Sequence, residues 1–373
     1  DRCQGGQLMR PRLKIEKRLV TSRRVMFLAS VLSIALALLA IALVFWEYGV
    51  DPIYAYTEIF IGSFGSIFGL SDTIAKAIPL MLCGVGLAVA FKALVWNIGA
   101  EGQLLMGAIA ATGIALYVFP DAPAAVVLPS MFVAGFLSGA LWGLVPSVLK
   151  AKLRANEVIT TLMMNYIASN LVNYLVYGAW KGLKEWGFPY TDKFPSSAWI
   201  PTLPIGTGRI HYPTLILALM LAVLTYVLVM RTKLGYEIRV TGENPDAARY
   251  AGMSYFKTAM LVMLISGGLA GLAGVGEVAG NPSHHRLRYP QGISPGYGFI
   301  AIIVAWLGRL HPLAIIISSL LFGGLLVGGD AIQVSLGLPF AVIGIFNGVI
   351  LFFVIGAELL LRYKVTIEWR REG

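Results

Sequence analysis

The first residues that could carry chemistry lie in the polar stretch 97–103 (Asn-Ile-Gly-Ala-Glu-Gly-Gln), which separates two long apolar runs. A carboxylate near membrane depth is costly, so Glu101 is a candidate functional residue. Gly99 and Gly102 permit the local unwinding or close helix contact that a polar break requires. Alternatively, the stretch is a helix N-terminus that Asn97 caps, with Glu101 offsetting the helix dipole.

A second polar set occupies residues 155–173 and begins Ala-Asn-Glu-Val-Ile-Thr-Thr-Leu-Met-Met-Asn-Tyr. On a helix, Thr161 and Asn165 share one face, and Tyr166, Asn170 and Asn173 lie on a neighbouring face. Amides inside a membrane-spanning helix need partners, so they either form hydrogen bonds between helices or line a pathway for a polar, uncharged solute. The candidate pathway residues of both stretches are Asn97, Glu101, Gln103, Asn156, Glu157, Thr161, Asn165, Asn170 and Asn173.

The third set lies in the longest charged connection, residues 231–257. Asn244 is a suitable N-cap and Pro245 a suitable first helical residue, so residues 246–251 favour a short helix that ends at Gly252. A charged helix presented from a membrane is either a docking element for a partner or a solvated connector. The candidate docking residues are Tyr236, Glu237, Arg239, Asn244, Asp246, Ala247, Ala248, Arg249 and Gly252.

No residue is assigned to catalysis or to a metal ion. His284 and His285 are adjacent, so their side chains point in different directions, and the sequence has no His-Glu-x-x-His pattern for zinc. The two cysteines, Cys3 and Cys83, lie in a basic tail and in an apolar run, which makes a disulfide or a cysteine metal site implausible. These patterns argue against an enzyme.

The composition indicates what kind of chain positions these groups. Of the 373 residues, 57% are apolar and only 13% are charged, whereas soluble proteins carry about a quarter charged residues. The apolar residues gather in runs that are long enough to cross a membrane, which takes about 20 residues per helix. We therefore predict an all-α integral membrane protein with about ten transmembrane helices, which excludes a soluble enzyme and a disordered chain.

The predicted spans form one transmembrane domain, residues 25–361, between a basic tail of residues 1–24 and a second tail of residues 362–373. Residues 1–8 precede Met9 and are expected to be an extension upstream of the natural start. The shorter segment 298–308 is a half-helix or a re-entrant segment by its length. About five spans precede the connection 181–212 and about five follow it. Because five is an odd number, two similar halves would insert with opposite orientations, as inverted repeats. The other predicted spans are 25–46, 73–91, 104–119, 122–149, 158–179, 213–230, 258–276, 312–329 and 331–357.

Lysine and arginine set the predicted orientation, because positively charged connections stay in the cytoplasm. The cations of both tails and of the connection 231–257 fall on one side if segment 298–308 crosses, which places both termini in the cytoplasm. Segments 47–72 and 181–212 are then exoplasmic, and their aromatic residues are expected to be interfacial anchors. This sidedness at a lipid bilayer accounts for the net charge of +10, so no nucleic-acid partner is expected.

Taken together, these stretches resemble a known family. Residues 97–103 and 155–166 are similar to two signature stretches of the ABC importer permeases that serve branched-chain amino acids, ribose-type sugars and nucleosides, above all the sugar/nucleoside branch. Asp246, Ala247, Ala248 and Gly252 resemble the EAA-type coupling loop of such permeases, with Asp in place of the usual Glu. The resemblance extends over most of the chain.

The resemblance implies a membrane subunit without an ATPase of its own, and the sequence contains no Gly-x-x-x-x-Gly-Lys-[Ser/Thr] phosphate loop. It further implies that ATP and magnesium bind to a separate ABC ATPase subunit and that two permease subunits, identical or related, associate. An exoplasmic solute-binding protein or lipoprotein would deliver the solute. The expected location is the cytoplasmic (inner) membrane of a prokaryote. ATP-driven closure of the ATPase subunits would move residues 236–253 and switch the pathway between inward and outward access.

The expected solute is neutral, because the polar set is rich in amides and hydroxyls and poor in fixed charge. Nucleosides are the first candidate and ribose-type sugars the second. A branched-chain amino acid is disfavoured, because the polar set has no pair of opposite charges that would bind its zwitterion. A secondary transporter is a further alternative. Its coupling carboxylates would be Glu101, Glu277 and Asp330, although all three lie near predicted span ends.

Overall fold

The computed structural model describes residues 9–17, 23–153, 155–183, 187–206, 208–339 and 341–371. The chain divides into two compact units: a terminal unit, Asp1–Ala55 with Leu338–Gly373, and a central unit, Tyr56–Gly337. The expectation for residues 1–8 falls outside the described residues. That the spans form a single domain stays a prediction.

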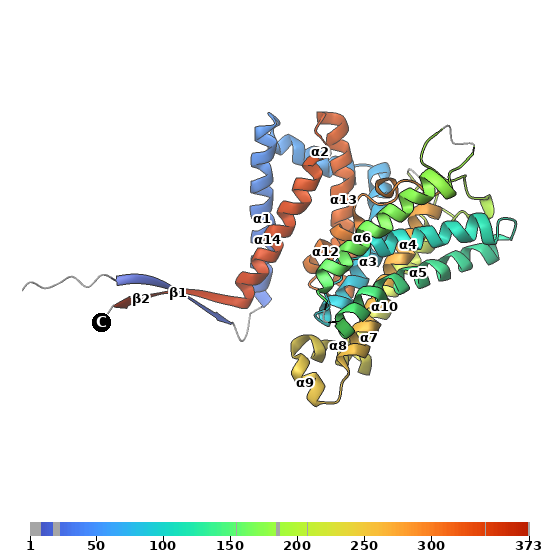
Figure 1. Ribbon diagram of the computed structural model, residues 1–373. Helices are drawn as coiled ribbons and strands as arrows, with labels where there is room; N and C mark the ends of the chain where they lie inside the picture. Colours follow the sequence, from blue (N-terminus) through green and yellow to red (C-terminus); the bar gives the residue numbers. More distant parts are fainter. Residues whose placement is uncertain are drawn as a thin grey trace, which may run out of the picture. The chain divides into compact units, whose positions relative to one another are not determined.

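In the terminal unit, α1 (Arg23–Glu47) packs against α14 (Ala341–Arg362), as Figure 1 shows. β1 (Met9–Lys17) pairs antiparallel with β2 (Tyr363–Arg371). The sequence predicted two tails here, without regular structure. Both segments alternate apolar and polar residues with the period of two that is typical of strands, and this signal was missed.

The remaining described elements are helices, which confirms the all-α prediction for the described residues of the central unit. α4 and α6 continue into π-helical turns, Ile114–Val118 and Leu175–Ala179, and a single 3₁₀ turn covers Ser196–Ala198. The helices are α2 (Pro52–Phe64), α3 (Ile67–Lys92), α4 (Ala100–Gly113), α5 (Ala124–Leu153), α6 (Glu157–Tyr174), α7 (Tyr212–Arg231), α8 (Lys233–Glu243), α9 (Pro245–Tyr250), α10 (Tyr255–Gly280), α11 (Pro290–Ile293), α12 (Tyr297–Leu307) and α13 (Pro312–Leu336).

Six helices in the described part of the chain are long and apolar enough to cross a membrane: α3, α4, α5, α7, α10 and α13. The number rises to 7 if α1 and α2 count as one broken span, and α12 is a shorter apolar helix. A multi-pass membrane protein is therefore confirmed. The count of about ten crossings, the inverted repeats and the cytoplasmic termini stay predictions.

Two predicted boundaries are wrong. The span predicted to begin at residue 73 begins at Ile67, where Ser66 caps α3, and the connection before it contains α2, at whose start Asp51 accepts a hydrogen bond from the Ile53 N–H at 2.8 Å. The break between the last two predicted spans is not at Asp330, which lies inside α13 and forms an ion pair with Lys76. α13 instead ends at Gly337, whose φ of 65° suits a left-handed C-cap.

The centre of the unit is α10, which packs against α3, α4 and α5. Its glycines permit this packing: a Cβ on Gly271 would overlap the carbonyl oxygen of Gly135 in α5, and a Cβ on Gly267 would overlap that of Gly139. Close backbone approach supplies the van der Waals contact that holds membrane helices together, since the hydrophobic effect does not distinguish lipid from side chain. α10 is thereby fixed against its neighbours.

Replacing Gly271 with alanine is expected to lower the free energy of unfolding by about 1–3 kcal/mol, because the added methyl group must displace the α5 backbone. Thermal melting of the purified protein in a single detergent measures this effect. Gly178→Ala is the matched control, since no atom lies within 4 Å of a Cβ built there. Unchanged melting of the Gly271 variant would contradict the close α5–α10 contact.

Candidate functional site

The N-termini of α4 and α12 meet inside the central unit. α4 begins at Ala100 after the N-cap Gly99, and α12 begins at Tyr297 after Gly296, whose φ is 95°. A Cβ on Gly298 would overlap the backbone of Ala100 and Glu101, so only glycine allows this approach. Helix N-termini carry partial positive charge, and the contact therefore brings two positive ends together.

Glu101 supplies the negative charge that this arrangement needs. Its side chain is 9% exposed, and its Oε2 accepts a hydrogen bond from the Gly298 N–H of α12 at 2.7 Å. Ser294 also interacts with the carboxylate, and its Oγ accepts a hydrogen bond from the Tyr297 N–H at 2.9 Å. Glu101 thus lies in the first turn of α4 and binds the first turn of α12, where it stabilises both ends.

Asn97 closes the turn that leads into α4. Its Nδ2 donates to Gln103 Oε1 and to Ser266 Oγ of α10, both at 2.9 Å, and its Oδ1 accepts from the Gly99 N–H at 2.9 Å. Asn97 and Gln103 are fully buried. The alternative in which Asn97 caps α4 is wrong, because Gly99 occupies the N-cap position.

α6 binds the same turn through Thr161 and Asn165, which confirms that these residues share a face. Thr161 Oγ1 accepts from the Ile98 N–H at 3.2 Å. The Asn165 amide donates to the Ile98 carbonyl and accepts from the Gly102 N–H, both at 2.8 Å. For this face of α6, hydrogen bonding between helices is therefore the correct alternative. Below, the polar junction means Asn97, Glu101, Gln103, Thr161 and Asn165 with their partners Ser266, Ser294 and Gly298.

The other candidate pathway residues lie outside the polar junction. Asn156 is exposed and caps α6, accepting from the Val158 N–H at 2.9 Å, while Glu157 forms an ion pair with Lys150 of α5. Asn170 is exposed and donates to the Tyr166 carbonyl of its own helix, and Asn173 is half-buried. Since a helix rises 1.5 Å per residue, the two ends of this set are about 25 Å apart. The nine predicted residues are therefore not gathered at one point, and their role in a pathway stays a prediction.

The neighbouring face predicted for Tyr166, Asn170 and Asn173 is exposed at Tyr166 and Asn170, and the prediction missed Tyr174 beside them. Tyr166 and Tyr174 are 60% and 67% exposed, and they flank the exposed Asn170 at intervals of four residues. Tyr177 in the following π-helical turn is also exposed. The four-residue spacing places Tyr166, Asn170 and Tyr174 on one side of the helix, and this spacing was visible in the sequence.

At one end of the unit, α8 and α9 extend beyond α7 and α10 (Figure 1). The short helix predicted for residues 246–251 is confirmed as α9, whose N-cap Asn244 accepts from the Ala247 N–H at 3.0 Å. It is followed by Gly252 with a φ of 78°. α8, which precedes α9, was not predicted. Its start is capped by Thr232, which accepts from the Gly235 N–H at 3.1 Å.

The candidate docking residues divide by their exposure. Asp246, Ala247 and Arg249 are exposed on α9, whereas Ala248 is buried and faces inward. On α8, Tyr236 is exposed, Glu237 is half-buried and Arg239 donates to the Val229 carbonyl at 2.6 Å, so Arg239 secures α8 to α7. Tyr250, which the sequence analysis overlooked, is 94% exposed at the end of α9.

The adjacent histidines have structural partners. His285 stacks on Trp199 with ring centroids 4.3 Å apart, and His284 contacts Arg288. Burial, together with the charge of Arg288, lowers the pKa of His284 to about 4. Within the described ranges, no group of three or more His, Cys, Asp or Glu side chains could hold a metal ion.

The two faces of α6 can be separated by mutation. Asn165→Ala is expected to lower the free energy of unfolding by about 1–3 kcal/mol for each buried backbone group left without a partner, namely the Ile98 carbonyl and the Gly102 N–H. Asn170→Ala, the matched control, removes an exposed amide and is expected to leave thermal melting unchanged. Equal melting of the two variants would contradict the structural role of Asn165.

Comparison with known proteins extends these observations. Residues 69–355 match the family described as branched-chain amino acid transport system / permease component. The glucose ABC transporter permease protein TsgB13 of Haloferax volcanii is 38% identical over 347 residues, which cover 91% of this chain and 89% of that protein.

Two relatives come from one organism, Bacillus subtilis. The guanosine ABC transporter permease protein NupP is 35% identical over 331 residues, covering 88% of this chain and 92% of that protein. The guanosine ABC transporter permease protein NupQ is 30% identical over 258 residues, covering 67% of this chain and 78% of that protein. These relatives are transport subunits, as the sequence motifs led us to expect, so this chain is a permease subunit rather than an enzyme. The chain belongs to the branched-chain amino acid transport system / permease component family of ABC transporters.

Proposed function

We propose that this chain forms the translocation pathway of an ABC importer for nucleosides. The observation that carries the proposal is the exposed face of α6, with Tyr166, Asn170 and Tyr174 in line. α6 is not among the helices of the described chain that are apolar enough to span a membrane on their own. An amide facing lipid at membrane depth is costly, so this face borders a pathway or a partner.

The chemistry of this face suits a nucleoside. Tyrosine rings offer flat surfaces on which a base can stack, and the Asn170 amide offers a donor and an acceptor to a neutral solute. The names of NupP and NupQ give guanosine as their solute. The name of TsgB13 gives glucose, which makes a ribose-type simple sugar the second candidate.

One helix face supplies only one wall, so the pathway requires a second permease subunit. Bacillus subtilis has two guanosine permeases, NupP and NupQ, that both resemble this chain. A pair of permeases named for one solute in one organism favours a heterodimer of related subunits over a homodimer. The inner membrane of a prokaryote remains the proposed location.

We assign α9 to the docking of the ATPase subunit, which binds ATP and magnesium. Tyr250 presents a nearly fully exposed ring beside Asp246 and Arg249. A large exposed aromatic side chain among charges is typical of the anchor of a protein interface. An exoplasmic solute-binding protein or lipoprotein delivers the solute on the opposite side.

Ala247→Arg is expected to uncouple ATP hydrolysis from uptake, because the long charged side chain would separate the exposed face of α9 from the ATPase. Proteoliposomes that contain the complete transporter allow ATP hydrolysis and guanosine uptake to be measured together. Substitution at Gly252 should act similarly, since its positive φ strains any other residue. Lys233→Ala on the exposed start of α8 is the control. Normal coupled uptake by the Ala247 variant would rule out this docking assignment.

Tyr174→Ala is expected to slow guanosine uptake by roughly tenfold or more, because one base–aromatic stack is worth about 1–3 kcal/mol. Ile216→Ala, which alters an exposed apolar residue of α7, is the control and should transport normally. Competition with unlabelled guanosine, ribose, glucose and leucine identifies the solute class. Strong competition by leucine alone would refute the nucleoside assignment, and strong competition by sugars alone would favour the second candidate.

A further inference from the structure

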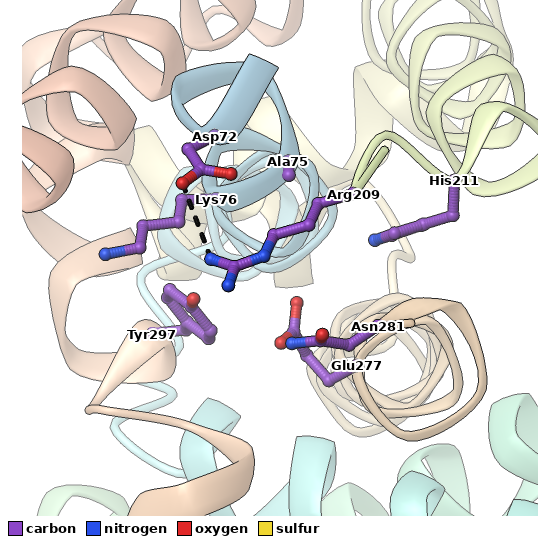
Figure 2. A pocket seen from close by; sticks show the side chains of 8 residues that line it. All are labelled: Asp72, Ala75, Lys76, Arg209, His211, Glu277, Asn281 and Tyr297. Carbon is purple, nitrogen blue, oxygen red and sulfur yellow. Dashed lines mark hydrogen bonds and ion pairs between the residues drawn. The ribbon is translucent and has the colours of Figure 1, made fainter. Parts of the chain in front are cut away.

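A small pocket lies at the end of α10 that is distant from α8 and α9. It opens between the first turns of α3, the end of α10, the first residue of α12 and the segment that precedes α7 (Figure 2). Its cavity of about 60 Å³ admits a few groups of the size of water but no nucleobase, since one water needs on the order of 10–15 Å³. α10 is 26 residues long, so its two ends are about 39 Å apart, with the pocket at one end and α9 just before the other. This is the side at which solute arrives under the proposed function.

His211 indicates that the pocket is built for a polar ligand. The side chain is 3% exposed, and its Nδ1 has no hydrogen-bond partner among the described residues. The ring rests on Gly276 and Gly280 of α10, where any Cβ would crowd it. Burial lowers the pKa of His211 to about 4, so the ring is neutral at pH 7 and can donate or accept a hydrogen bond.

Three of the four charged side chains that line the pocket form ion pairs, and Glu277 forms none with the described residues. Lys76 pairs with Asp330, and Arg209 pairs with Asp72 at 3.4 Å. The Glu277 carboxylate accepts no hydrogen bond from the residues that the structure describes. Figure 2 shows this carboxylate next to the Asn281 amide, both facing the Arg209 guanidinium. Glu277 can therefore accept two further hydrogen bonds from a ligand.

We propose that this pocket is a subsite for the vicinal hydroxyl groups of a ribose or a simple sugar. Two adjacent hydroxyls can donate to the Glu277 carboxylate, while Asn281, Tyr297 and His211 offer partners to the hydroxyl oxygens. A neutral diol leaves both ion pairs intact. An amino acid such as leucine, by contrast, has no pair of hydroxyl groups to place there.

This subsite rests on the proposed function and narrows it. Nucleosides and simple sugars share vicinal hydroxyls and differ in the rest of the molecule. A pocket that binds only the two hydroxyl groups would admit either class. Other contacts, such as Tyr166 and Tyr174 on the exposed face of α6, would then distinguish nucleosides from sugars.

The test places a reporter in the pocket without altering its polar groups. Ala75 lines the pocket, so Ala75→Cys is introduced into a chain in which Cys3 is replaced by serine; Cys83 is buried. A membrane-impermeant thiol reagent then labels the transporter of permease pair and ATPase in proteoliposomes. Ribose, glucose and guanosine are each expected to slow labelling several-fold, whereas 2′,3′-dideoxyguanosine and leucine are not.

Two variants make the result specific. Glu277→Gln in the same background is expected to remove the protection, which is measured within each variant as the ratio of the labelling rates with and without solute. Ser283→Cys reports an exposed position two residues beyond Asn281, and its labelling should be the same with and without solute.

The subsite would be overturned by labelling of Ala75→Cys that no diol slows, by equal protection with 2′,3′-dideoxyguanosine, or by protection that persists in Glu277→Gln. Guanosine and glucose uptake, measured with the binding protein added to the same proteoliposomes, tests the proposed function separately. Uptake without protection overturns the subsite alone. Protection without uptake supports the subsite and overturns the proposed function.

Discussion

The central unit depends on one carboxylate at the meeting point of two helix N-termini. α4 and α12 approach so closely that Gly298 lies against the backbone of Glu101, and each end carries about half a positive charge. Without a counter-charge these ends would repel each other in a medium of low dielectric constant. Glu101 supplies it from within the first turn of α4 and accepts the Gly298 N–H of α12. The cost of burying a carboxylate is offset because the carboxylate satisfies the backbone of one helix and the dipoles of both.

The polar junction extends this single contact to α6 and α10. Asn97 ties the turn before α4 to Ser266 of α10, and Asn165 ties the same turn to α6. In lipid, every polar group needs an internal partner, so such a turn can exist at membrane depth only if neighbouring helices satisfy it. The buried face of α6 is thus committed to structure, and under the proposed function its exposed face lines the solute pathway. Polar residues of one helix therefore serve two purposes, which their position around the helix separates.

The sequence predicted the local features of the molecule better than its distant contacts. Asn244 and Gly252 delimit α9 as expected, since caps are written into neighbouring residues, and Thr161 and Asn165 share a face because helical periodicity is local. Glu101 was singled out, but its partner lies 197 residues away, and no local pattern points to it. The pocket is assembled from four segments that are distant in the sequence. Glu277 and Asp330 therefore looked alike in the sequence, as carboxylates at span ends, although only Asp330 forms an ion pair.

α3 and α8 connect α9, the proposed docking helix, to the polar junction. A Cβ on Gly242 of α8 would overlap the carbonyl oxygen of Lys92, the last residue of α3. Beyond this contact, Val89, Val229 and Ile238 join α3, α7 and α8 in a buried apolar cluster. Two backbones in contact leave no side chain between them that could change rotamer and absorb a displacement. A shift of α8 must therefore move the end of α3, from which residues 93–96 lead to Asn97 and the turn into α4. Under the proposed docking of the ATPase at α9, this close packing through glycine is expected to pass a movement of α8 to the polar junction as a rigid-body displacement.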